Sequence, residues 1–225
     1  MPIFKLNIDN YTFPNPEFAN NDGLLALGGD LSVGRLLNAY ANGIFPWFNE
    51  DDPILWWSPN PRFVLYPKEF KAKKSLLQKI RNSNFDIRFD YDFKSIINAC
   101  ATTKRLHEEG TWITNEMEQA YINLYATGAA HCVGVYENNK LVGGLYGVQI
   151  GNVFTGESMF SLKSDTSKIA LYKLCQNADN FGVQLIDVQI ETPHLVSLGA
   201  KGINRNKFIS QLEKSYKQTK FEKWQ

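Results

Sequence analysis

The chain of 225 residues is long enough for one large domain or two unequal ones, and its 44% hydrophobic and 21% charged residues are ordinary for a folded globular protein. It has no apolar run long enough to cross a membrane and no signal-peptide pattern at its start, so we expect a protein that is neither membrane-embedded nor secreted. The net charge of +1 conceals an acidic first part and two basic segments further along.

The first sixty residues are rich in Pro, Asn, Gly and aromatic residues, and one helix is predicted among them, at about residues 32–41. Ser32 or Asp30 can cap its first turn, and Gly43 is suited to end it. Residues 1–60 carry two basic and seven acidic side chains, so this part of the chain is acidic.

A basic segment follows. The sequence PNPR at 59–62 predicts a linker that enters a strand at 63–67, and residues 68–82 predict a basic amphipathic helix. From residue 62 to residue 81 there are seven basic side chains and one acidic one, and the last 25 residues add seven basic and two acidic side chains. Two such segments indicate a surface that attracts a polyanion, although a solvated helix face rich in lysine would have the same composition.

The change of pattern near residue 61 indicates a small N-terminal domain at 1–61 and a larger domain at 62–225. The larger domain is predicted to contain, in order, a helix, a three-stranded antiparallel meander, a helix, a strand and a helix. This order resembles the acetyltransferase-like (GNAT) fold, in which the fourth and fifth strands splay apart and the gap holds an acyl group. We therefore expect an α+β protein with a small α/β domain before a GNAT-like one. The predicted elements are the helix 114–127, the strands 131–137, 141–150 and 153–160, the helix 167–181, the strand 184–190, a short helical piece at 194–200 and a helix at 206–217.

Eight aromatic residues fall within residues 40–66, many of them in two proline-flanked runs, IFPWF and LWWSP. Prolines hold such rings at fixed angles, which suits stacking on nucleobases, worth about 1–3 kcal/mol per base. The alternative is that the rings form the core of a small domain that is poor in Leu, Ile and Val. We assign that structural role to Phe45, Trp56 and Trp57, and a ligand role to Trp47.

Three polar side chains are predicted to meet where the strands splay. Asp187 and Gln189 are two apart on one strand and should leave the same face, and Glu157 lies on the preceding strand across the gap. Carboxylates on neighbouring strands that point into an apolar cleft indicate a catalytic site. A buried acid paired with a lysine is the structural alternative.

Several motifs, in order and spacing, resemble one family, the leucyl/phenylalanyl-tRNA–protein transferases. The resemblance covers about residues 11–215, and its strength lies in the agreement of unrelated motifs rather than in any one of them. The motifs are FPNPEFANNDGLLALGGDLS (13–32), GIFPWF (43–48), PILWWSP (53–59), GTWIT (110–114), LVGGLYGV (141–148), GESMFS (156–161), LIDVQI (185–190) and SLGA (197–200).

The resemblance implies an aminoacyltransferase that takes Leu, Phe and in some members Met from aminoacyl-tRNA. The acceptor is the α-amine of a protein that begins with Arg or Lys, which is thereby marked for degradation (the N-end rule). Because the donor is already an activated ester, we expect no ATP, metal or other cofactor. We also expect a monomer in the cytoplasm.

The resemblance also implies roles for individual residues. Gln189 would orient the amine or the ester, because an amide cannot act as a base, and Asp187 would hold Gln189 and stabilise positive charge on the attacking nitrogen. Glu157 would bind the α-ammonium or ribose of the donor, or take up a proton. The acidic N-terminal part or Glu157 itself would bind the acceptor's basic side chain.

Further residues are implied for binding the donor. Leu174 and Ala178 stand where family members often have aromatic residues, which leaves the preference between Leu and Phe open. The pocket for the donor side chain would be lined by Leu145, Phe154, Met159, Leu171, Leu174 and Ile186. The 3′-terminal adenosine would contact Tyr40, Trp47, Trp112 and Tyr121, and the tRNA backbone would contact Lys71, Lys73, Lys74, Lys79 and Arg81.

Three other functions are compatible with some of these features. An N-acetyltransferase would need a glycine-rich loop for coenzyme A, but residues 161–170 contain no glycine, and Asp165 there would oppose a pyrophosphate. A non-catalytic RNA-binding module would use the aromatic residues and the basic helices alone. Fem-type peptidoglycan aminoacyltransferases also combine this fold with tRNA, but they have two related lobes, and this chain has no internal repeat.

The histidines and cysteines give little indication of chemistry. His107, His131 and His194 are far apart with no ligands at metal-binding spacing, so a metal site is not expected, although His194 is predicted to lie near the cleft. The three cysteines are scattered and odd in number (Cys100, Cys132 and Cys175), which favours reduced thiols and a cytoplasmic location.

Overall fold

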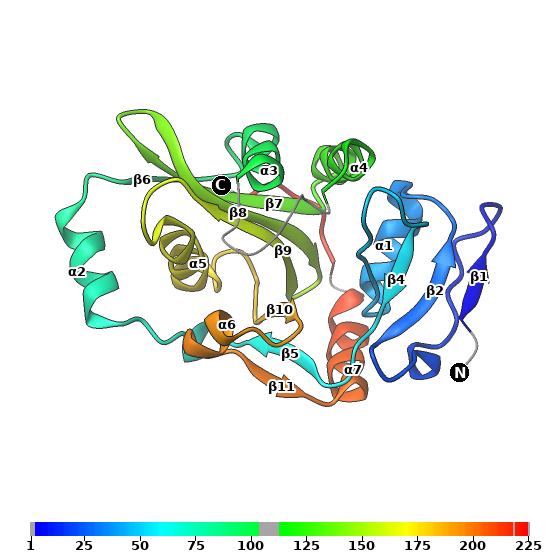
Figure 1. Ribbon diagram of the computed structural model, residues 1–225. Coiled ribbons are helices and arrows are strands. Elements are labelled where there is room, and N and C mark those ends of the chain that lie inside the picture. Colours follow the sequence, from blue (N-terminus) through cyan, green and yellow to red (C-terminus); the bar gives the residue numbers. More distant parts are fainter. Residues whose placement is uncertain (1–2, 104–112, 218, 225) are drawn as a thin grey trace.

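The computed structural model describes residues 3–103, 113–217 and 219–224, which form two sheets and the helices around them (Figure 1). The smaller sheet has the strand order β1-β2-β4-β3, and helix α1 packs beside it. Its elements are β1 (Phe4–Leu6), β2 (Leu24–Gly28), α1 (Val33–Ala41), β3 (Phe45–Pro46) and β4 (Leu55–Trp57), with a short 3-10 helix at Pro16–Phe18.

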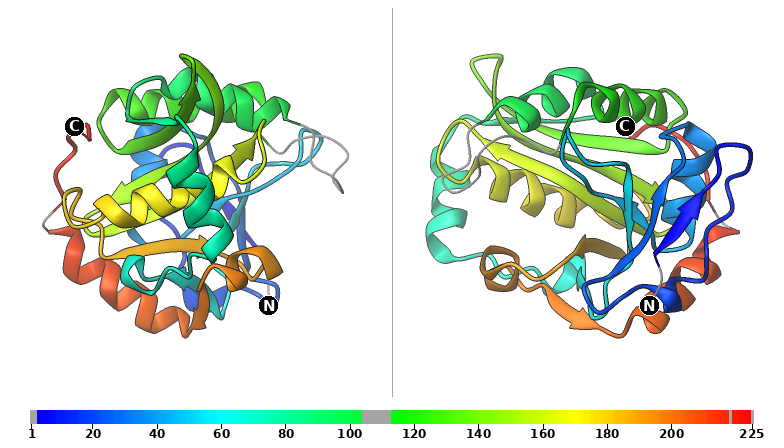
Figure 2. Two further views of the ribbon diagram at one scale, coloured as in Figure 1. Left: turned by 90° about the vertical axis from the view of Figure 1, so that its left-hand side faces the viewer. Right: turned by 45° about the vertical axis from the view of Figure 1, so that its right-hand side comes forward.

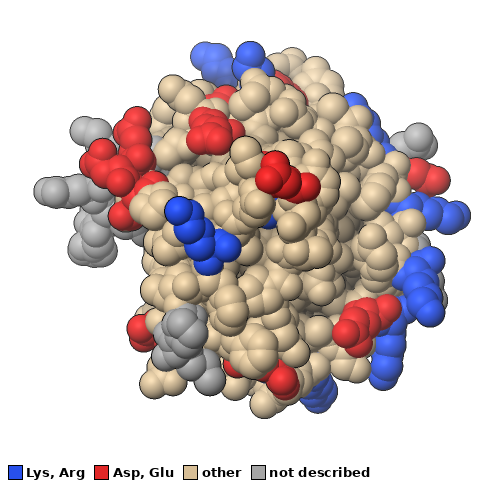
Figure 3. Space-filling view, turned by 90° about the vertical axis from the view of Figure 1, so that its right-hand side faces the viewer, with Lys and Arg blue, Asp and Glu red and all other residues tan. Residues whose placement is uncertain are grey.

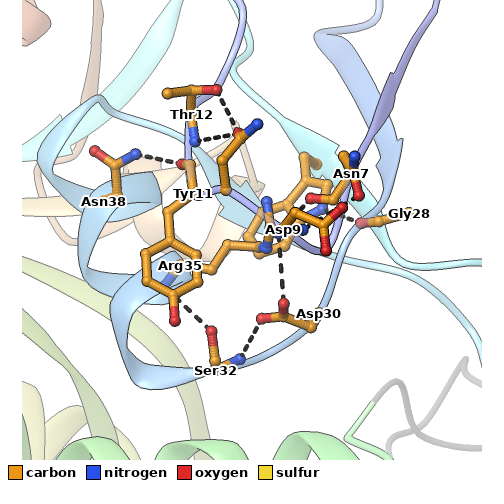
Figure 4. Close-up of polar contacts among 11 residues, drawn as sticks. Asn7, Asp9, Tyr11, Thr12, Gly28, Asp30, Ser32, Arg35 and Asn38 are labelled. Atoms are coloured by element: carbon orange, nitrogen blue, oxygen red, sulfur yellow. Dashed lines mark hydrogen bonds and ion pairs between the residues drawn. The ribbon is translucent and has the colours of Figure 1, made fainter.

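The turn between β2 and α1 is built from the GGD motif (Figure 4). Gly28 and Gly29 have φ angles of 83° and 77°, which favour glycine, and a Cβ on Gly29 would lie 2.9 Å from Cζ of the Arg35 guanidinium. The carboxylate of Asp30 accepts hydrogen bonds from the backbone N–H of Ser32 at 2.8 Å and from Arg35 at 3.4 Å. Ser32 is the N-cap of α1, as predicted.

The larger sheet has seven strands in the order β11-β5-β10-β9-β8-β7-β6. Helices α3 and α4 cover one face and α5 covers the other (Figures 1 and 2). The strands are β5 (Arg62–Leu65), β6 (Asp86–Phe89), β7 (Ala130–Glu137), β8 (Lys140–Ile150), β9 (Val153–Ser161), β10 (Leu185–Gln189) and β11 (Lys201–Ile203). The helices are α2 (Lys74–Asn82), α3 (Phe93–Thr102), α4 (Asn115–Ala126), α5 (Thr166–Asn177), α6 (Pro193–Ser197) and α7 (Arg205–Tyr216).

The splayed strands that place the site are β9 and β10, the one parallel pair in the part of this sheet that the structure describes. They are paired only from Leu185–Val153 to Asp187–Thr155, while β9 continues to Ser161. A bulge in β10 between Asp187 and Gln189 further separates the two strands. The meander, the helices on both faces and the splayed pair confirm the predicted α+β, acetyltransferase-like architecture.

Most predicted elements of the second half are confirmed, with two changes of boundary. The basic helix α2 begins at Lys74 and not at residue 68, because Pro67–Glu69 forms a separate 3-10 turn. Helix α5 ends at Asn177, four residues before the predicted end at 181. The sequence analysis did not predict β6, α3, β11 or the short strands of the smaller sheet.

The division into domains at residue 61 stays a prediction. The chain passes from one sheet to the other between Trp57 and Arg62. However, one cluster of buried apolar side chains includes Leu25 and Trp56 from the smaller sheet together with Tyr121 and Ile150 from the larger part. The two sheets therefore share a core.

Candidate active site

A cavity of about 1170 Å³ opens where β9 and β10 separate, and both sheets contribute to its walls. The loop after β3 supplies Trp47, Glu50 and Asp51, and the splayed strands supply Glu157 and Gln189. An apolar wall and a row of polar groups therefore meet in one space, which is the arrangement typical of a binding site for a small group.

The predicted donor pocket forms the apolar wall of this cavity. Of its six residues, all but Leu174 line the cavity. Leu174 is fully buried in the cluster behind α5, because it faces the sheet and not the opening. Phe45, which we expected to have only a structural role, also lines the cavity. The pocket residues that line it are Leu145, Phe154, Met159, Leu171 and Ile186.

Glu157 lies at the junction between the apolar wall and the polar groups. One carboxylate oxygen, Oε2, accepts a hydrogen bond from the Tyr121 hydroxyl at 2.8 Å, and Oε1 accepts one from Nε2 of Gln189 at 3.3 Å. Burial raises the pKa of Glu157 to about 7, and the hydrogen bonds from the tyrosines only partly offset this effect. Glu157 can therefore exchange a proton near neutral pH.

Asp187 lies behind the cavity and does not line it. Its two oxygens accept hydrogen bonds from Nε of Arg62 at 2.8 Å and from NH2 of Arg62 at 2.7 Å, and both side chains are buried. Oδ2 also accepts a bond from Thr155 at 3.3 Å, and Oδ1 accepts one from the backbone N–H of Gln189 at 3.0 Å. Asp187 is thus a buried acid paired with a base, as in the structural alternative, and it fixes the backbone that carries Gln189.

The backbone of Gln189 departs from a regular strand. Its φ is 60°, and the bulge after Asp187 breaks the alternation on which the prediction of a shared face was based. The hydrogen bond from its backbone N–H to Asp187 holds this conformation, and its amide reaches Glu157. Strained backbone of this kind is often found at functional sites.

The structure corrects the role predicted for Tyr40 and Tyr121. Only 2% of Tyr40 and none of Tyr121 is exposed, so neither ring has a free face on which an adenine could stack. Their hydroxyl oxygens lie 2.5 Å apart, and Tyr121 in turn donates to Glu157. Burial raises the pKa of both tyrosines well above the usual value, so both remain donors. They form a hydrogen-bonded pair that supports Glu157 from behind.

Trp47 is placed as the sequence analysis predicted, on the surface at the edge of the cavity. It is 45% exposed, and its ring centroid lies 5.7 Å from that of Trp57. Nε1 of Trp57 donates to the Trp47 carbonyl at 2.6 Å, which fixes the loop. Trp56 is fully buried and bonded to the Gly28 carbonyl, in agreement with a structural role. Trp112 lies outside the described residues.

The residues predicted to contact the tRNA backbone lie on α2 and the segment before it. Lys71, Lys73, Lys74 and Arg81 are exposed. Lys79 instead donates to Asp165 at 3.1 Å. A hydrogen bond from Lys168, together with that of Lys79, lowers the pKa of Asp165 to about 2, so a carboxylate stands where an acetyltransferase would hold a pyrophosphate.

The sequence analysis missed the partner of Asp187. Arg62 lies between the rings of Phe45 and Phe208, each with its centroid 4.8 Å from the guanidinium carbon, and donates to the Gly43 carbonyl at 3.0 Å. Its place directly before the buried strand β5 was the only signal in the sequence. His194 lines the cavity, and burial lowers its pKa, which favours the neutral ring. His107 lies outside the described residues, and His131 is buried against Asp90.

Comparison with known proteins identifies the family. A family model described as leucyl/phenylalanyl-tRNA protein transferase matches residues 64–213, and one for the N-terminal domain of the same family matches residues 29–60. The chain belongs to the leucyl/phenylalanyl-tRNA protein transferase family. It is therefore an aminoacyltransferase.

Two relatives named leucyl/phenylalanyl-tRNA–protein transferase illustrate the extent of the similarity. One from Hydrogenovibrio crunogenus is 52% identical over 212 residues, which are 93% of this chain and 83% of that protein. One from Shewanella piezotolerans is 49% identical over 210 residues, which are 92% of this chain and 89% of that protein. The sequence similarity thus extends over both sheets of the transferase.

Solved structures with a weaker similarity include two acetyltransferases. A ribosomal-protein-alanine N-acetyltransferase from Brucella melitensis has a TM-score of 0.36 and 12% identity, covering 56% of this chain and 89% of that one. A predicted acetyltransferase from Clostridium acetobutylicum has a TM-score of 0.35 and 12% identity, covering 63% of this chain and 94% of that one.

Two features are absent from the described residues. None of the helices there is both long and apolar enough to cross a membrane. Nor do the described residues contain a group of three or more His, Cys, Asp or Glu side chains that could hold a metal ion.

Proposed function

We propose that this transferase moves Leu or Phe from aminoacyl-tRNA to the α-amine of proteins that begin with Arg or Lys, and that this marks them for degradation. The observation that carries the proposal is the position of Glu157, a carboxylate with a pKa of about 7 between an apolar pocket and the open mouth of the cavity. The enzyme acts as a monomer in the cytoplasm and uses no cofactor.

The donor side chain enters the apolar pocket lined by Leu145, Phe154 and Met159, and this places its ester carbon near Glu157. An apolar pocket distinguishes side chains that differ by one methylene by only about 1–3 kcal/mol, so Leu and Phe are both accepted. The adenine at the 3′ end of the tRNA stacks on the exposed ring of Trp47. The exposed lysines before and on α2 attract the tRNA backbone.

The chemical step is the aminolysis of an ester. The acceptor ammonium has a pKa near 8 and must lose a proton before it attacks, and Glu157 takes that proton. The amine nitrogen forms a bond to the ester carbon, the bond from that carbon to the ribose oxygen breaks, and the proton passes to the departing ribose hydroxyl. Gln189 orients the reacting groups through its amide, while Asp187 acts from behind by fixing Gln189. Positioning supplies most of the acceleration.

The acceptor's basic side chain is bound at the mouth of the cavity. Glu50 and Asp51 line the cavity there, on the loop that follows Trp47, and Glu157 lies deeper inside. On the face of the molecule in Figure 3, acidic side chains gather toward one edge and basic side chains toward the other. This separation of charge lets the basic acceptor and the anionic tRNA approach by different paths.

The proposal is tested with purified protein, labelled Leu-tRNA and a peptide with an N-terminal Arg, without ATP. Label should appear in the peptide, and an otherwise identical peptide with an N-terminal Glu should remain unlabelled. Labelling from acetyl-coenzyme A but not from charged tRNA would instead favour an acetyltransferase. If tRNA binds but no label is transferred from it, the RNA-binding module replaces the enzyme.

A further inference from the structure

Residues 219–224 follow α7 and lie beyond residue 213, where the match to the family model ends. The segment, drawn in red in Figures 1 and 2, leaves α7 and returns to the larger sheet. Within it Phe221 is 41% exposed, whereas Trp224 is only 7% exposed and belongs to the apolar cluster that surrounds the donor pocket. Trp224 is therefore the residue by which this segment is inserted into the core.

The indole of Trp224 is held on every side. It stacks between the rings of His131 (centroids 4.3 Å apart, planes at 3°) and Phe181 (4.4 Å, 7°). Its Nε1 donates to Oε1 of Gln149 at 3.0 Å, and its backbone N–H donates to Oδ2 of Asp90 at 2.8 Å. A ring with both faces stacked and both donors bonded has one orientation, so whatever its edge contacts is also fixed in position.

The edge of Trp224 contacts a wall of the donor pocket. Its centroid lies 5.3 Å from that of Phe154, which lines the cavity. The Phe154 ring also lies over Gly147 on β8, where a Cβ would come within 2.6 Å of it. Phe154 is thus confined by the backbone of Gly147 beneath it and by the indole beside it. On α5 the same cluster offers the smaller Leu174 and Ala178, so Trp224 supplies much of its bulk.

We infer that Trp224 is a positioning residue for donor choice: by holding Phe154 in place, it limits the size of the aminoacyl side chain that the pocket accepts. The inference rests on the proposed donor pocket. Without the indole, Phe154 would move into the vacated space and the pocket would deepen. A larger pocket favours the larger donor, so Phe would gain relative to Leu.

The experiment compares kcat/KM for Phe-tRNA and Leu-tRNA at a saturating concentration of one acceptor peptide. Trp224→Ala should raise the Phe-to-Leu ratio roughly tenfold, mainly through KM for the donor, because it changes the shape of an apolar pocket. Trp224→Phe, which retains a stacked ring, should restore a ratio near that of the wild type. Phe221→Ala, in the same segment but away from the cluster, is the matched control and should leave the ratio unchanged. If Trp224→Ala does not fold, as judged by near-UV circular dichroism, Trp224→Leu gives the same comparison.

Leu171→Ala separates failure of this inference from failure of the proposed pocket, because Leu171 lines the cavity directly. A changed ratio in Leu171→Ala with an unchanged ratio in a folded Trp224 variant would overturn the inference and leave the donor pocket standing. An unchanged ratio in both would overturn the donor pocket, and the inference with it. Absence of transfer by the wild-type protein would instead refute the proposed function.

Discussion

Replacing Asp187 by alanine would leave the guanidinium of Arg62 buried with only the Gly43 carbonyl as a polar partner. In the wild-type protein, Asp187 accepts two hydrogen bonds from Arg62, at 2.8 and 2.7 Å, and neither side chain is more than 1% exposed. Removing one partner of such a buried pair costs about 3–5 kcal/mol of unfolding free energy, because the remaining charge is not solvated. For a chain of this size, this cost corresponds to a fall in Tm of about 6–20 °C.

The assay combines thermal unfolding with transfer from Leu-tRNA at a temperature where each variant is folded. We expect Asp187→Ala to reduce both stability and activity, because the backbone N–H of Gln189 is also left without its acceptor. The double variant Arg62→Met, Asp187→Leu removes both charges and fills the space, so its Tm should return most of the way to that of the wild type. It should not recover activity, since the bulge at Gln189 would still lack its support.

One result would refute this reasoning. If Asp187→Ala abolished transfer while Tm fell by less than about 1 °C, the buried pair would contribute little to stability and Asp187 would act on the reacting groups themselves. A double variant that recovered full activity would be equally damaging, because it would show that Gln189 is positioned without Asp187.

Four further predictions concern charge. Burial raises the pKa of Glu157 from its ordinary 4.5 to about 7, so transfer should fall as the pH drops below about 7, and Glu157→Gln should abolish this dependence together with most of the rate; a wild-type profile flat between pH 6 and 8 would contradict its role as a base. Because the folded protein binds this proton more tightly than the unfolded chain, the free energy of unfolding falls as the pH rises from 4.5 to about 7, and Glu157→Gln should be more stable than the wild type at pH 8 in thermal unfolding. Glu50→Gln with Asp51→Asn should raise KM for an Arg peptide several-fold without changing KM for the donor, and Glu116→Gln, exposed on α4, is the control. Lys73→Ala with Lys74→Ala should reduce the slope of log binding constant against log salt for tRNA by about 1 for each phosphate that the variant no longer binds, measured against Lys94→Ala on α3; equal slopes would remove α2 from the tRNA surface.

Local pattern predicted the elements of the second half because those elements are long and regular. The strands of the meander alternate or run apolar over eight or more residues and are joined by tight turns, so their pairing follows from neighbours in sequence. The strands of the smaller sheet have only two to five residues between glycines and prolines, which is too short for a periodic signal. Their pairing is set by the shared core, which the sequence does not display.

The site could be predicted only in part for a similar reason. Glu157 and Gln189 follow from their places on the two splayed strands. The pairing of Arg62 with Asp187 joins residues 125 positions apart, and no local pattern announces it. The roles of Tyr40 and Tyr121 were mistaken because their distinguishing property is burial: both rings are enclosed by the packing of α1 against α4. Trp47 was predicted correctly because a loop between prolines can expose a ring.

The apolar cluster that joins the two sheets has a consequence for how such a chain can be recombined. The family model for the N-terminal domain ends at residue 60, which invites the exchange of that domain between relatives. Yet Leu25 and Trp56 share a core with Ile150, and the hydroxyl of Tyr40 meets that of Tyr121 across the same boundary. A chimaera joined there would have to inherit both halves of each contact from compatible parents. Substitutions on one side of residue 61 are therefore expected to be tolerated only together with matching ones on the other.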